Sequence, residues 1–140
     1  MSGIKRTPAD VNFSRAKRES EDYICENCGK DYRHEPHMMD CSHIFSRKHR
    51  RVRWHPLNAL CLCRSCHQKM GDKPPVHAEL AKKKLGEEGY WELMRLHNEI
   101  LKIPKTKEKD IAAHYKAEHK RLIALRMDGQ QGRLELRNWE

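Results

Sequence analysis

Four cysteines in the sequence have the spacing of a tetrahedral metal site. Cys25 and Cys28 are separated by two residues, as are Cys63 and Cys66, and 34 residues lie between the two pairs. Four thiolates fill the coordination shell of Zn²⁺ at about 2.3 Å per sulfur. Because this shell leaves no position for water, we expect a structural zinc. The remaining cysteines, Cys41 and Cys61, are expected to be small buried hydrophobic residues.

Three polar residues lie around these cysteines at positions where they could act together. His43 is expected to end one strand, Asn58 to open the next, and His67 directly follows Cys66. A histidine has an unperturbed pKa of about 6.5, which suits proton transfer near neutral pH. Each residue alone has a simpler explanation, as a surface histidine, a turn asparagine or a helix histidine. Their joint spacing is therefore what indicates a site.

The order His43, Asn58, Cys63-Arg-Ser-Cys66-His67 resembles the His-Asn-His (HNH) endonuclease motif, in which a β-hairpin and one helix hold a catalytic divalent metal. The likeness covers about residues 23–75. Asp40-Cys-Ser-His43, Arg53-Trp54 and the Leu85-Gly-Glu-Glu segment are also similar to phage recombination nucleases of the NinG (Rap) family. The resemblance implies a metal-dependent DNA endonuclease that nicks one strand per site, in phage DNA recombination, processing or packaging.

The same resemblance implies a role for each polar residue. His43 would be the general base that deprotonates water, and Asn58 would orient the hairpin. His67 would bind the catalytic Mg²⁺ or Mn²⁺, which would polarise the phosphate and stabilise the leaving oxygen.

The residue before His43 departs from the motif. Many HNH nucleases carry a metal-binding Asp or His there, whereas this chain has Ser42. Asp40 lies two residues earlier, so in a strand it projects from the same face as Ser42. We expect Asp40 to be the second ligand of the catalytic metal, with Asp72 as an alternative.

Basic residues concentrate around the proposed site. The chain has a formal net charge of +9, and the segment between Cys41 and Gly71 contains seven Arg or Lys and no Asp or Glu. A local excess of positive charge attracts nucleic acid, although it can also be a solvated face. The residues expected to contact DNA phosphates from a loop beside His43 are Arg47, Lys48, Arg50, Arg51 and Arg53. For Arg53 and Trp54 a structural role is the alternative, with Trp54 packing under the hairpin.

The elements that position these residues predict an α+β fold: a zinc-stapled ββα hairpin–helix core with an N-terminal helix and a C-terminal helical extension. A helix is expected over 8–20 from the Thr7-Pro8 start, and a short helix should carry Cys66 and His67. The strands are expected at 38–46 and 57–62, and the later helices at 76–85, 88–102 and from 106 to 129. The corresponding organisation is an arm (1–22), a nuclease core (23–75), a helical extension (76–128) and a tail (129–140).

The composition of the chain indicates its cellular compartment and the kinds of partner it could bind. Only 37% of the residues are hydrophobic, so a fold of this size needs help from a metal or a partner. No signal peptide and no apolar run of about 20 residues is present, which predicts a cytoplasmic protein with no membrane partner. A double-strand cut would require two sites, for example a homodimer, and other phage DNA-processing proteins are further candidate partners. The alternative function is a non-catalytic zinc-containing nucleic-acid-binding module, which would not need His43 or His67.

Overall fold

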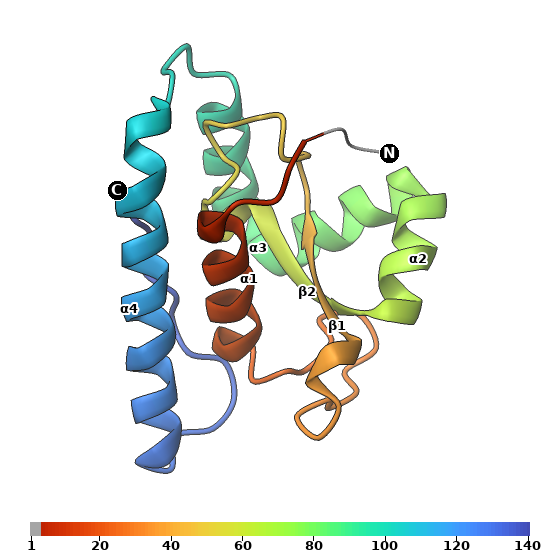
Figure 1. Ribbon diagram of the computed structural model, residues 1–140. Coiled ribbons are helices and arrows are strands. Elements are labelled where there is room, and N and C mark those ends of the chain that lie inside the picture. Colours follow the sequence, from red (N-terminus) through yellow and green to blue (C-terminus); the bar gives the residue numbers. More distant parts are fainter. Residues whose placement is uncertain (1–3) are drawn as a thin grey trace.

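A computed structural model describes residues 4–140 and confirms an α+β fold (Figure 1). In chain order, the elements are α1 (Pro8–Ser20), β1 (Met39–His43), β2 (Ala59–Cys63), α2 (Arg64–Asp72), α3 (Pro74–His97) and α4 (Glu108–Met127). Single 3-10 turns occupy Pro36–Met38, Pro56–Asn58 and Lys105–Lys107. Within residues 4–140, no helix combines the length and the apolar character needed to cross a bilayer.

Helix α1 begins where its sequence predicts. The Thr7 hydroxyl accepts a hydrogen bond from Asp10 N, and Thr7 N donates to the Asp10 carboxylate at 2.8 Å, so the two residues form a capping box. The buried face of α1 carries Phe13 and two alanines and packs against the hairpin. The same residues also pack along α4, where the ring centroids of Phe13 and Tyr115 are 4.9 Å apart, and α4 runs beside α1 in the same direction (Figure 1).

The two strands form an antiparallel hairpin in which His43 pairs with Ala59 and Asp40 pairs with Leu62. Both strands are shorter than predicted. The chain leaves β1 after His43, and Pro56 begins a 3-10 turn in which His55 Nδ1 accepts from Leu57 N at 3.0 Å. Asn58 therefore lies in the turn before β2. Every residue of β2 is buried, so this strand is the centre of the fold.

The predicted helices at 76–85 and 88–102 form one kinked helix, α3. At Gly86 the backbone has a φ of 74° and a ψ of 172°, which glycine adopts without steric cost. The predicted extension to residue 102 is wrong, because α3 ends at His97. Ile100 and Leu101 lie in the connection to α4 and are 98% and 52% exposed.

The tail after α4, for which the sequence predicts no element, is folded against the domain without regular structure. Leu134 N donates to the Ser20 carbonyl at 2.8 Å, and Arg137 N donates to the Glu118 carboxylate at 2.8 Å. Leu136 and Trp139 pack on the core formed by α1 and α4. The last residues thereby enlarge a core that the low hydrophobic content leaves thin.

Candidate active site and cysteine cluster

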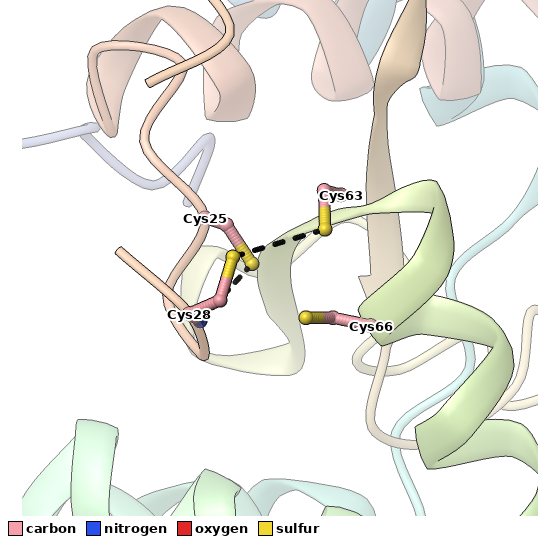
Figure 2. Close-up of side chains that lie close together, drawn as sticks. All are labelled: Cys25, Cys28, Cys63 and Cys66. Atoms are coloured by element: carbon pink, nitrogen blue, oxygen red, sulfur yellow. Dashed lines mark hydrogen bonds between the residues drawn. The ribbon is translucent and has the colours of Figure 1, made fainter. Parts of the chain in front are cut away.

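The four paired cysteines converge at one end of the hairpin (Figure 2). Their sulfur atoms all lie within 4.8 Å of one another, and Cys28 Sγ and Cys63 Sγ are 3.9 Å apart. Cys25 and Cys28 come from a tight turn in which Gly29 N donates to the Cys25 carbonyl. Cys63 ends β2 and Cys66 lies in the first turn of α2. An all-thiolate set of four fits Zn²⁺, so this cluster is a candidate structural zinc site.

Local hydrogen bonds favour ionisation of one of these thiols. Burial alone would raise the pKa of Cys63, but hydrogen bonds from the Cys66 backbone and from the Tyr32 hydroxyl lower this pKa to about 7. Metal binding by cysteine requires the thiolate, so this thiol is prepared for it. The cluster connects the turn at 25–28 to the start of α2 and so fixes where that helix begins.

A cleft of about 600 Å³ opens between α1, β1 and the first turn of α2. Three of the predicted catalytic and metal-binding residues line it: His43 from the end of β1, Asp40 from near the start of β1, and His67 from α2. The structure therefore brings the two histidines to one cavity, although they come from different elements. The alternative ligand Asp72 is exposed at the end of α2 and is not among the residues that line this cleft.

The orientation of His43 is set by a backbone carbonyl. Its Nε2 lies 3.2 Å from the Arg53 carbonyl oxygen, which can only accept, so Nε2 carries the proton and Nδ1 keeps its lone pair. Burial lowers the pKa of His43 to about 4, although the hydrogen bond to Arg53 and the charge of Asp10 act in the opposite direction. At neutral pH the ring is thus uncharged, with a lone pair on Nδ1, and it is a weaker base than an ordinary histidine.

Asp10 supports the segment that holds His43. Its carboxylate accepts a forked pair of hydrogen bonds from Arg53, at 3.0 and 2.6 Å, and a third from Trp54 Nε1 at 3.1 Å. The Asp10 and Arg53 side chains are each 4% exposed. The sequence identifies Asp10 only as a helix-capping acid, and no local signal indicates that it also binds a loop more than 40 residues away.

This burial favours a structural role for part of the predicted DNA-binding loop. Arg53 is enclosed and paired with Asp10, so the structural alternative holds for it, and Trp54 is buried under the hairpin. Arg51 is bound by Glu99 and Glu140, and Arg50 pairs with Glu108 and donates to the Ile103 carbonyl. These three arginines hold the loop onto the domain.

The two remaining basic residues of the loop, Arg47 and Lys48, differ from these three arginines in their contacts. Within residues 4–140, neither Arg47 nor Lys48 has a carboxylate within ion-pair distance. Arg47 lines the cleft and Lys48 is exposed.

Asp40 and His67 are in direct contact. Asp40 Oδ2 and His67 Nδ1 are 3.0 Å apart, and Arg64 donates to both carboxylate oxygens of Asp40 at 3.2 and 3.0 Å. Partial burial would raise the pKa of Asp40, but the hydrogen bonds from Arg64 and His67 lower it, so the carboxylate is charged at neutral pH. Because the Asp40 carboxylate accepts in this contact, His67 Nδ1 carries the proton and Nε2 keeps its lone pair.

Asn58 is buried and braces the chain just beyond His43. Phe45 N donates to Asn58 Oδ1 at 2.7 Å, and Asn58 Nδ2 donates to the Phe45 carbonyl at 3.0 Å. Ser42, at the position where the HNH motif usually has a metal ligand, instead contacts His77 Nε2 of α3 at 3.3 Å. The sequence gives no indication of this His77 contact.

Comparison of the chain with models of known protein families, with curated proteins and with solved structures finds no match in any of the three.

Proposed function

We propose that this protein is a metal-dependent endonuclease of the HNH type that hydrolyses one DNA strand per site. The observation that carries the proposal is the single cleft shared by a neutral His43 and by the Asp40–His67 pair. A shared cleft with a proton acceptor and a metal-binding pair is what phosphodiester hydrolysis requires.

His43 supplies the proton acceptor in this proposal. The Arg53 carbonyl holds Nε2–H, so Nδ1 can take a proton from a water molecule in the cleft. The nearby Asp10 carboxylate stabilises the imidazolium that results, because its charge favours the protonated ring. Asn58 keeps the chain after His43 in place through its two bonds to Phe45.

Asp40 and His67 would hold a divalent cation, Mg²⁺ or Mn²⁺, which polarises the phosphate and stabilises the departing oxygen when bound. Arg64 would have to yield part of its contact with Asp40 for this cation to bind. The four cysteines would hold zinc as a purely structural ion, because a four-sulfur shell has no open position.

A second function, a zinc module that binds nucleic acid without cutting it, is favoured by one observation. Arg64 already contacts both oxygens of Asp40, so the carboxylate has a counter-charge without any added metal. A binding module would use the same cysteines and arginines but would have no need for the orientation of His43.

Plasmid nicking separates the two functions. Wild-type protein is incubated with supercoiled, linear, branched and single-stranded DNA in Mg²⁺ or Mn²⁺, beside His43→Ala and the matched control His34→Ala, whose histidine is exposed and is not among the cleft-lining residues. We expect wild type and His34→Ala to nick and His43→Ala to lose activity, with zinc content and thermal unfolding unchanged. Equal cutting by His43→Ala, or no cutting of any substrate, would overturn the proposal.

The branched and single-stranded substrates test the wider proposal of a role in phage DNA recombination, processing or packaging. A preference for them over plasmid would support that role. Analytical ultracentrifugation with and without DNA tests whether a homodimer forms to make a double-strand cut.

A further inference from the structure

Two arginines from the N-terminal part of the chain line the cleft. Arg6 directly precedes the N-cap of α1 and Arg18 lies in its last turns, and both face the cavity that holds His43. On the opposite side, Arg47 follows the end of β1 and Arg64 begins α2. The cleft thus has arginines on both of its walls, whereas the sequence predicts them on one.

We infer that α1 forms the second wall of a nucleic-acid groove, in which Arg6 and Arg18 hold the DNA backbone on either side of the phosphate that faces His43. The inference rests on the proposed function only in taking DNA as the ligand. Binding along α1 can be measured whether or not the strand is cut.

The charge balance of the cleft supports a polyanion. Its two acidic residues are already compensated inside the protein, Asp10 by Arg53 and Asp40 by Arg64. Of the cleft arginines, Arg6, Arg18 and Arg47 have no carboxylate within ion-pair distance in the part of the chain from 4 to 140. Three uncompensated cations in one cleft favour a ligand with repeated negative charges.

The side chain of Arg18 is also held in place. Its Nε donates to the Ser14 carbonyl one helical turn earlier, at 3.2 Å. This bond leaves the two terminal nitrogens of the guanidinium, which form the fork that binds phosphate oxygens.

The spacing along α1 fits a DNA strand. Ten positions of α1 separate Pro8 from Arg18, which is about 15 Å at the helical rise of about 1.5 Å per residue, and Arg6 lies two residues before the helix begins. Along the axis of a duplex, this length corresponds to about four base-pair steps at about 3.4 Å each. His43 lies near the middle of this span, because its ring centroid is 6.1 Å from that of Phe13, halfway along the helix. The two arginines would therefore contact phosphates on opposite sides of the reacting one.

The test measures DNA affinity in the full-length His43→Ala protein, so that the strand stays intact. Fluorescence anisotropy with a labelled 20-nucleotide strand, single or in a duplex, is recorded at several salt concentrations. Arg6→Ala and Arg18→Ala are compared with Arg15→Ala, an exposed arginine of the same helix that is not among the residues lining the cleft. Circular dichroism and zinc content confirm that each variant is folded, and Arg18→Lys tests whether charge alone suffices.

We expect three- to tenfold weaker binding for Arg6→Ala and Arg18→Ala at the lower salt concentration. The slope of log affinity against log salt should fall by about 1 for each. Arg15→Ala should match the parent in both quantities, and Arg18→Lys should recover the slope. Parent-like affinity and slope for Arg6→Ala and Arg18→Ala, an equal loss for Arg15→Ala, or no DNA binding by the parent would each overturn the inference.

The two proposals can fail separately. If wild type nicks DNA while Arg6→Ala and Arg18→Ala bind like the parent, the strand does not follow α1 but the nuclease assignment remains. If wild type nicks no substrate while both arginines contribute to the salt slope, the groove remains and the nuclease assignment fails.

Discussion

His43 Nε2 lies 3.2 Å from the carbonyl oxygen of Arg53, and the side chain of that arginine is bound by Asp10 on α1. A single arginine thus links the proposed general base to the first turn of the N-terminal helix. Because Asp10 also forms the capping box with Thr7, the start of α1 and the orientation of His43 depend on the same carboxylate.

Replacing Asp10 with asparagine should reduce stability and alter the proposed catalysis. Breaking a buried ion pair from one side leaves the other charge uncompensated, which costs about 3 to 5 kcal/mol of unfolding free energy. The Asp10 charge also favours protonated His43, so its loss should lower the pKa of this histidine further. We expect the acidic limb of the pH–rate profile for nicking to move to lower pH, with DNA affinity changed less than the cleavage rate.

The matched control is Asp110→Asn, which changes an exposed acid in the first turn of α4. It should leave the unfolding free energy within about 0.5 kcal/mol of wild type and the pH profile in place. An Asp10→Asn profile that coincides with that of Asp110→Asn would show that Asp10 has only a structural role.

The acid sensitivity of the fold should depend partly on His43. Its pKa is about 4 in the folded chain and about 6.5 when unfolded, so the unfolded state binds the proton first as pH falls. The contribution of His43 to the free energy of unfolding is fully present above pH 6.5 and is lost as the pH decreases towards 4. The loss should reach about 2 kcal/mol by pH 5, since each pKa unit corresponds to about 1.36 kcal/mol.

His43→Gln removes this titration and keeps a polar side chain at the position. Urea unfolding at pH 7, 6 and 5 should show a shallower decline for the variant than for wild type. Other histidines with lowered pKa values, such as His55 and His77, are present in both proteins and cancel in the comparison. Parallel declines in the two proteins would contradict the assignment of the acid loss to His43.

The sequence predicts the parts of the fold that depend on local chemistry. The cysteine spacing places four sulfurs together, and the Thr7-Pro8 start gives the bounds of α1. The hairpin is predicted in type but not in length, because the side chain of Asn58 and the turn at Pro56 end the strands early. Such tertiary hydrogen bonds have no signature in residue spacing.

Long-range pairing explains what the sequence does not reveal about the cleft. A run of arginines in one loop predicts a phosphate-binding segment. However, Arg50, Arg51 and Arg53 are bound by partners from the start of α4, from the tail and from α1. Conversely, Arg6 and Arg18 have no distinguishing neighbours in the sequence and reach the cleft only because α1 packs beside β1. Charge density along the chain is therefore a poor guide to which arginines remain free.

Loss of the metal from the cysteine cluster should unfold the hairpin. Cys28→Ser changes the one exposed member of the cluster, so a large effect would come from lost metal affinity and not from lost packing. We expect wild type to bind one zinc per chain and the variant to bind less, with a thermal midpoint lowered by more than about 5 °C. Zinc is measured by mass spectrometry and by colorimetric release with a chelator.

Cys41→Ala is the control for this experiment, because Cys41 packs against the core away from the cluster. Its zinc content should equal that of wild type even if the thermal midpoint falls slightly. A full complement of zinc in Cys28→Ser, or its loss in Cys41→Ala, would contradict the four-sulfur site.

The second cation should bind at Asp40 and His67, in competition with Arg64. Titration of zinc-loaded protein with Mn²⁺, followed by electron paramagnetic resonance, reports this binding without any need for cleavage. Asp40→Asn and His67→Ala should each weaken Mn²⁺ binding at least tenfold, by analogy with the loss of metal-orienting groups in other sites, while zinc content stays at one per chain. Arg64→Ala should instead tighten Mn²⁺ binding, because it removes the guanidinium that contacts both oxygens of Asp40.

Asp72→Asn, which changes the exposed carboxylate at the end of α2, should leave Mn²⁺ affinity unchanged. If Asp40→Asn binds Mn²⁺ as wild type does and Asp72→Asn does not, the cation lies at the far end of α2 and His43 has no metal beside it.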